Sequence, residues 1–475
     1  MSTHVDIEEM PAELAPSASL IADWVLTDPQ LARNCAGAVD PLEIAARLET
    51  HGISNRVAIE TFGCADVFEA AEIVYAALPF DSGEPPAPRA EPPGGPKDLV
   101  RGALYAVPAL FLPVVVVGFS IHPHWWVLPI GLTVAWAISQ SVAVFGWSLR
   151  GRNDNRSDAL LACGSVVVSA VVCLGCALLA TIWLGGNEAS VLEAVGVSVY
   201  IAASGVLLFH ASEWLLMLCM VPAAIGSIVT IGALHSGVSR AAGAWAVVAT
   251  VVLVVGVAIR HLSGQHWHRP VLFREDYQRA TRYFFYGLGC GLMTSVFIGF
   301  AGQTDGTGGT LVIAVWPLLL TLGLMEWQLR SFRNLALSAV ASSTDLDEFA
   351  HRIRMAFLRS TGTYIGALAL LSAAAVAIGH ERHATLVPLL LAAVGSIGLT
   401  FFLALMLASS GQVGLVLACW AVSFTVLGTA LLVALVRFGH ISASAGIICL
   451  LVATGTAIVI LAVESKSVLI SPLSY

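Results

Sequence analysis

Few ionisable or strongly polar side chains lie inside the apolar stretches of this sequence, and those few are where chemistry could occur. Gln140 lies within one apolar stretch, and Glu326 lies about one turn before the end of another. Burying such a group in hydrocarbon is costly, so each is a candidate for a substrate or proton path. Glu326 also stands four residues before Arg330, where the two side chains can form an ion pair. Both interpretations of Glu326 stay open.

A short pattern that ends an apolar stretch occurs twice, as WSLRGRN at 147–153 and as WQLRSFRN at 327–334. It contains four arginines, Arg150 and Arg330 at the same position of the pattern and Arg152 and Arg333 offset by one residue. Guanidinium groups bind phosphates and carboxylates through paired hydrogen bonds, so these residues could attract phosphate or acidic sugar groups. Alternatively, they anchor the inner ends of membrane helices, where Trp and Arg are common. The repeat favours two homologous halves.

Catalytic and metal-binding patterns are not evident. The predicted outer loops at 122–126, 185–189, 303–309 and 380–384 hold no nucleophile with a base, no paired acids and no metal triad. Four loop histidines have no further ligands at reliable spacing: His122, His124, His380 and His383. There is also no phosphate loop for ATP hydrolysis. The sequence therefore predicts a protein that is not an enzyme and that needs no metal or cofactor.

The composition predicts a polytopic membrane protein. Hydrophobic residues make up 57% of the 475 residues and charged residues only 11%, with a mean hydropathy of +0.84. No soluble class has this composition. The net charge of −8 comes from the first 96 residues, which hold 16 acidic residues against 4 arginines. A nucleic-acid surface is therefore not expected.

Twelve apolar stretches predict twelve membrane helices. They lie near 102–120, 126–149, 159–184, 189–210, 213–234, 241–259, 283–302, 309–330, 361–379, 384–408, 411–436 and 441–463. The boundary between His210 and Glu213 is the least distinct. With twelve spans, nearly all basic residues fall on one side, which places both termini in the cytoplasm by the positive-inside rule. We expect halves at 99–260 and 283–465, a basic connection at 261–282 and a tail at 466–475.

The first and seventh spans carry residues that can interrupt a helix. The first holds Pro108 and Pro113, and the seventh holds Gly287, Gly289 and Gly291. Interrupted helices at matching positions of two halves point to a transport pathway. Glycine is also common where membrane helices pack closely, which is the alternative.

The stretch from Thr344 to Ser360 predicts an amphipathic helix. Thr344 and Asp345 resemble N-cap residues. Apolar residues then recur at helical spacing, and three arginines avoid that stripe. The apolar members are Leu346, Phe349, Ile353 and Phe357, and the arginines are Arg352, Arg354 and Arg359. This pattern is typical of a helix that lies on a membrane surface.

The N-terminal residues 1–80 predict an acidic cytoplasmic module of three or four short helices. Asp40-Pro41-Leu42-Glu43 combines an N-cap, a proline at the first helical position and a capping-box acid, and Gly52 can end that helix. The stretch 81–98 is a proline-rich linker. The module could dock a cytoplasmic glycosyltransferase or serve as a passive acidic head.

Two six-helix halves, basic loops after the second and eighth spans and a broken first span resemble the multidrug, oligosaccharidyl-lipid and polysaccharide (MOP) exporter superfamily. The segment MEWQLRSFRNLALSAVASSTDLDEFAHRIRMAFLRSTGTY at 325–364 resembles the inner-loop region of Pel-type polysaccharide exporter subunits. The resemblance covers about Val100 to Val463. It implies an all-α cell-membrane transporter that exports a polysaccharide or flips a lipid-linked saccharide among membrane lipids.

Two other functions stay open. A major facilitator carrier also has twelve spans and repeated basic loops, but GWSLRGRNDNRSD at 146–158 lacks the Asp that precedes the basic residues in that family's loop. A membrane scaffold that holds a glycosyltransferase through residues 1–80 is the other alternative.

Overall fold

The computed structural model describes a helical chain. It covers residues 19–28, 40–78, 127–151, 188–210, 212–232, 237–263, 273–303, 309–343, 345–381 and 386–468, with isolated residues between them. The chain divides into two compact units, Met1–Arg89 and Ala90–Tyr475. The predicted linker and nearly all of the first and third predicted spans, with Pro108 and Pro113, lie outside the described residues.

The N-terminal unit contains short helices, as the sequence predicts. They are α1 (Ser19–Thr27), α3 (Pro41–Thr50), α4 (Asn55–Phe62) and α5 (Val67–Ala77). One small core joins them, in which Ile44, Leu48 and Val74 are fully buried. The unit therefore has its own hydrophobic interior.

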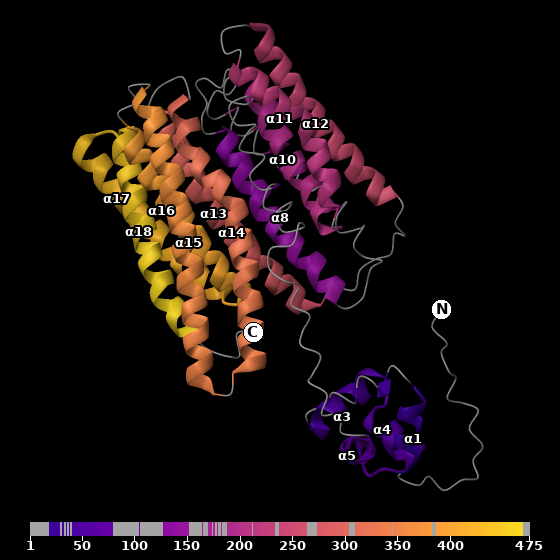
Figure 1. Ribbon diagram of the computed structural model, residues 1–475. Helices are drawn as coiled ribbons and strands as arrows, with labels where there is room; N and C mark the ends of the chain where they lie inside the picture. Colours follow the sequence, from indigo (N-terminus) through magenta and orange to yellow (C-terminus); the bar gives the residue numbers. More distant parts are fainter. Residues whose placement is uncertain are drawn as a thin grey trace. The chain divides into compact units, whose positions relative to one another are not determined.

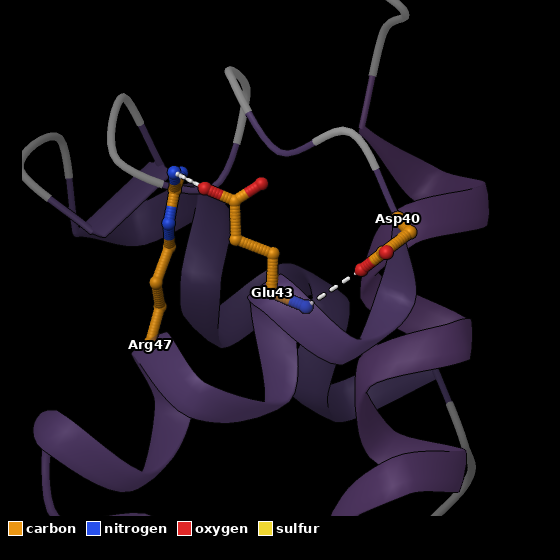
Figure 2. Close-up of polar contacts among 3 residues, drawn as sticks. All are labelled: Asp40, Glu43 and Arg47. Carbon is orange, nitrogen blue, oxygen red and sulfur yellow. Dashed lines mark hydrogen bonds and ion pairs between the residues drawn. The ribbon is translucent and has the colours of Figure 1, made fainter. Parts of the chain in front are cut away.

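Local capping sets the ends of α3. The Glu43 backbone N–H donates to the Asp40 carboxylate over 2.9 Å, and Pro41 occupies the first helical position. The Glu43 side chain pairs forward with Arg47 and does not reach back toward the cap (Figure 2). Asp40 is thus the predicted N-cap, but Glu43 forms an i,i+4 ion pair. The helix ends before Gly52, whose φ of 92° suits glycine.

The membrane unit contains ten long helices among its described residues (Figure 1). Their bounds are α8 (Val127–Gly151), α10 (Glu188–Phe209), α11 (Glu213–Gly232), α12 (Gly237–Ser263), α13 (Arg274–Ala301), α14 (Gly309–Ser342), α15 (Leu346–Glu381), α16 (Val387–Ser409), α17 (Val413–Phe438) and α18 (Ala443–Val468). Each overlaps one predicted span, although α13 and α15 begin before their spans and α14 ends after its span. The boundary predicted between His210 and Glu213 is confirmed, because α10 ends and α11 begins there.

The helices group into two packed sets. In the first, α10 packs on α8 and α12, and α11 packs on α12. In the second, α14 packs on α15 and α16, while α18 packs on α16 and α17. Each set has its own core of buried side chains. The first set comes from the first predicted half and the second from the second half.

Helices α8 and α13 form the tight seam between the two sets, which we call the α8–α13 seam. A Cβ on Gly291 would lie 2.7 Å from the Thr133 Cα, and one on Gly287 would lie 2.9 Å from the Ala137 Cα. Side chains there would collide, so the seam needs glycine. Near one end, the hydroxyls of Thr133 and Ser295 lie 2.5 Å apart.

The prediction that glycines break the seventh span is wrong. Helix α13 runs without interruption from Arg274 to Ala301. Gly287 and Gly291 permit the approach of α8, and a Cβ on Gly289 would lie 2.7 Å from the Trp420 indole. The break was predicted only because glycine can interrupt a helix. The absence of a side chain also lets two helices pack closely, and that is the role of these glycines here.

The prediction of a separate surface helix after Thr344 is also wrong. Those residues are the first turns of α15, which continues into the apolar run as one helix of 36 residues. Phe349 and Ile353 are buried, and the Phe357 ring meets the Phe332 ring at 6.4 Å. The apolar stripe packs on α14, because α14 extends to Ser342 and supplies a helical partner (Figure 1).

Candidate functional site

A cavity of about 280 Å³ lies where helices of the two sets face each other. Helices α8, α10 and α11 line it from the first set, and α13, α14 and α16 line it from the second. Its wall includes Trp136, Tyr200, Ser204, Thr294, Leu319 and Phe401. Binding sites for organic molecules typically have about 300–1,000 Å³, so this space holds one apolar group of moderate size.

Aromatic contacts shape one side of the cavity. The Trp136 ring meets the Phe401 ring edge to face, with centroids 5.8 Å apart, and so links α8 to α16. Phe401 meets Trp420 of α17 in the same way at 6.4 Å. Edge-to-face aromatic pairs are favourable and keep the rings in fixed orientations. The cavity therefore has a defined aromatic wall that both sets of helices build.

Polar groups at the cavity wall are few, and most are already hydrogen-bonded. The Ser204 hydroxyl donates to the Ile201 carbonyl over 3.0 Å, and the Thr294 hydroxyl donates to the Cys290 carbonyl over 3.0 Å. The Tyr200 hydroxyl is buried and has no hydrogen-bond partner among the described residues. Such a group is costly unless something pairs with it. Tyr200 therefore contributes an unsatisfied hydroxyl beside the cavity, which a molecule there can reach only when the neighbouring side chains move.

Gln140 lies one helical turn beyond Trp136 on α8 and does not line the cavity. Its side chain is half-buried and lies next to Gly287, whose added Cβ would be 3.0 Å from the Gln140 Cγ. The structure thus brings two of the predicted site residues together, at the α8–α13 seam. Their place there indicates a packing role, and a role in a substrate path stays a prediction.

Glu326 and Arg330 form the ion pair expected from their spacing. The Arg330 Nε donates to Glu326 Oε1 over 3.0 Å, and both side chains are about one quarter to one third exposed, at 26% and 30%. A partly exposed pair within one helix contributes little to stability. The pair leaves Glu326 with a structural partner, and its role in a proton path stays a prediction.

The repeated arginine pattern is described only in part. Arg333 is exposed on α14. Arg150 lies near the end of α8, but its side chain is outside the described part of the structure, as is Arg152 altogether. The predicted grouping of Arg150, Arg152, Arg330 and Arg333 around a cytoplasmic mouth therefore stays a prediction.

Sequence reasoning missed Tyr200 and the aromatic pair Trp136 and Phe401. Charged and amide side chains define the candidates within the spans, and Tyr200 is neither. A phenol in the middle of the stretch 189–210 was the available signal, because Tyr in membrane helices usually lies at the interface. The pairing of Trp136 with Phe401 has no sequence signal, since 265 positions separate them.

No protein-family profile and no curated protein matches this sequence. Solved structures do match the chain. The outward-facing structure of a multidrug resistance MATE family transporter of the MOP superfamily aligns with 78% of this chain and 94% of its own, at 15% identity and a TM-score of 0.50. The crystal structure of a eukaryotic MATE transporter covers the same shares at 13% identity and a TM-score of 0.50.

At this identity, the likeness shows the fold. The membrane unit has the all-α, multi-pass fold of these MATE transporters, and ten of its long helices lie in the described residues. The fold class predicted from the sequence is confirmed.

Proposed function

We propose that this protein is a membrane transporter that flips a lipid-linked saccharide across the cell membrane. The observation that carries the proposal is the cavity between the two sets of helices, whose wall both sets build. In a transporter of two halves, rocking one half against the other opens such a space to alternate faces of the membrane. The likeness of fold to MATE transporters supports this mode of action.

The cavity wall favours an amphipathic substrate over a bare sugar polymer. Its residues are mainly leucine and aromatic, and the hydroxyls of Ser204 and Thr294 are bonded to their own helices. A polymer of sugars would bring many hydroxyls against this wall without partners, which is costly. A lipid carrier needs no such partners, and the Tyr200 hydroxyl can pair with one polar group at its head once rocking of the halves uncovers it. The resemblance to Pel-type subunits supports the saccharide.

The test is a flipping assay with purified full-length protein in liposomes. A fluorescent lipid-linked saccharide is added, and a membrane-impermeant quencher measures the fraction in the outer leaflet over time. Ser204→Phe fills the cavity from α10 and should reduce flipping to the rate of protein-free liposomes. Val248→Phe is the matched control, because Val248 lies on α12 away from the cavity and is exposed.

The outcomes separate the transporter from its substrate. Normal flipping by the Ser204→Phe variant would show that the cavity is not the path. If the wild-type protein moves a fluorescent hydrophobic drug and leaves the lipid-linked saccharide in place, the saccharide assignment is wrong. The multidrug neighbour makes such a drug the informative competitor.

We also propose that the N-terminal unit docks the glycosyltransferase that makes the saccharide. Its separate core and acidic surface suit a docking module on a tether. The glycosyltransferase should copurify with the full chain and be lost when residues 1–80 are deleted. Copurification with both chains would assign the contact to the membrane unit.

A further inference from the structure

We propose that α15 binds the headgroup of an anionic membrane lipid at the point where the helix leaves the membrane. Arg354 and Arg359 provide the charge, and Met355 and Leu358 provide the apolar surface between them. The inference concerns the outer face of one helix and is independent of the transported substrate.

These four residues share the face of α15 that is turned away from the protein. Met355 is 53% exposed and Leu358 is 56% exposed, while Phe349, Ile353 and Tyr364 are buried on the opposite face. Residues three apart are neighbours on a helix surface. Met355 and Leu358 therefore form one apolar strip, and at 100° per residue Arg354 lies on one side of it and Arg359 on the other.

The strip lies at the depth of lipid headgroups. The apolar run of α15 extends from about Thr361 to Ile378, long enough to cross the hydrocarbon layer. A rise of about 1.5 Å per residue puts Leu358 roughly 5 Å and Met355 roughly 9 Å beyond Thr361. The headgroup layer is about 5–8 Å thick on each side of the membrane. Met355 and Leu358 thus reach from the hydrocarbon edge to the outer headgroups.

Arg354 and Arg359 have unused hydrogen-bond donors. Their guanidinium groups form no ion pair or hydrogen bond with any other described residue. Arg352 on the same helix differs in this respect, since it pairs with Glu348 at 2.5 Å. A guanidinium group binds a phosphate through two parallel hydrogen bonds. Two free arginines beside one strip therefore fit a phosphate-bearing headgroup.

The apolar strip identifies a lipid, and not free phosphate, as the ligand. Inorganic phosphate gains nothing from Met355 and Leu358, whereas a lipid places its glycerol and first acyl carbons against them. The exposed strip also continues into the membrane-facing side chains Ile365 and Leu370, which are 44% and 73% exposed. An acyl chain can follow this surface along the helix.

The test measures lipid binding to the full-length chain in a nonionic detergent. Native mass spectrometry counts bound phosphatidylglycerol, with phosphatidylcholine and inorganic phosphate as separate probes. The variant Arg354→Gln/Arg359→Gln removes both charges and should weaken phosphatidylglycerol binding about 30-fold. This factor follows because each arginine near an anionic membrane surface contributes about 1 kcal/mol of binding free energy. The control Arg47→Gln/Arg56→Gln removes two arginines of the N-terminal unit, outside the membrane helices, and should bind as the wild type does.

A second variant tests the apolar strip. Met355→Ser/Leu358→Ser should also weaken phosphatidylglycerol binding, since both side chains are exposed and their loss leaves the core intact. Undiminished binding by the double arginine variant would overturn the site. The anionic-lipid assignment would be overturned if phosphatidylcholine bound as well as phosphatidylglycerol. It would also be overturned if inorganic phosphate competed fully and the serine variant bound phosphatidylglycerol as the wild type does. Circular dichroism confirms that each variant is folded.

Discussion

The two sets of membrane helices meet tightly at the α8–α13 seam and loosely at the cavity, although α8 takes part in both. At the seam, Thr133 and Ala137 face glycines, and the two backbones come close. At the cavity, Trp136 faces large side chains of the second set. The size of the facing side chains therefore decides where the sets hold together and where they leave space.

Hydrogen bonding differs in the same way. The Thr133 and Ser295 hydroxyls each lie within 2.9 Å of the Pro129 carbonyl, so the seam satisfies its polar groups. The Tyr200 hydroxyl at the cavity finds no partner among the described residues. A satisfied contact fixes two helices, and an unsatisfied one leaves binding capacity for another molecule. We infer that the seam acts as the pivot and the cavity as the space that changes.

The largest expected effect comes from adding a side chain at the seam. Gly291→Leu would place a Cβ 2.7 Å from the Thr133 backbone, so α8 and α13 must separate. We expect the free energy of unfolding to fall by about 3 kcal/mol or more. The resulting loss of folded protein is measured as a smaller monodisperse fraction in detergent. Gly362→Leu on α15 is the control, because nothing lies within 4 Å of its Cβ. A folded Gly291→Leu protein would show that the seam can move apart.

A smaller effect of opposite sign is expected at the cavity. Tyr200→Phe removes a buried hydroxyl that has no partner among the described residues. The free energy of unfolding should therefore rise by about 1 kcal/mol. Thermal unfolding in detergent should show a higher midpoint, while flipping of the lipid-linked saccharide slows. A lower midpoint would mean that the hydroxyl is satisfied in the resting protein.

The smallest effect is expected from a seam hydroxyl. Ser295→Ala removes one hydroxyl that donates to the Pro129 carbonyl, while the Thr133 hydroxyl still donates to it. The free energy of unfolding should therefore fall by about 0.6 kcal/mol. The same unfolding measurement detects it as a lower midpoint. Thr425→Ala is the control, since its exposed hydroxyl bonds only its own helix. Equal shifts in both variants would remove the distinction between seam and surface.

Much of the fold could be predicted from the sequence, because hydropathy reports directly on whether a segment can lie in lipid. The boundary at His210 and Glu213 and the cap at Asp40 are local, and each agrees with the structure. The predictions failed where a pattern has two structural solutions. An apolar stripe at 346–357 suits a membrane surface and a neighbouring helix equally well, and only the length of α14 decides between them.

The candidate site was much less predictable, because it depends on contacts between distant residues. Gln140 and Gly287 were selected for different reasons, and the structure brings them together at the seam. The cavity depends on Trp136, Phe401 and Tyr200, whose side chain types are ordinary in membrane helices. A single sequence carries no record of which aromatic residues face each other across two halves.

Helices α14 and α15 are long enough to form a rigid helical projection. These helices have 34 and 36 residues, so each is about 50 Å long and exceeds the hydrocarbon layer by about 20 Å. Their adjacent ends extend beyond the other helices of the membrane unit (Figure 1). An antibody fragment bound to these projecting ends would rotate together with the second set of helices. Its tilt in electron micrographs would report the angle between the two halves.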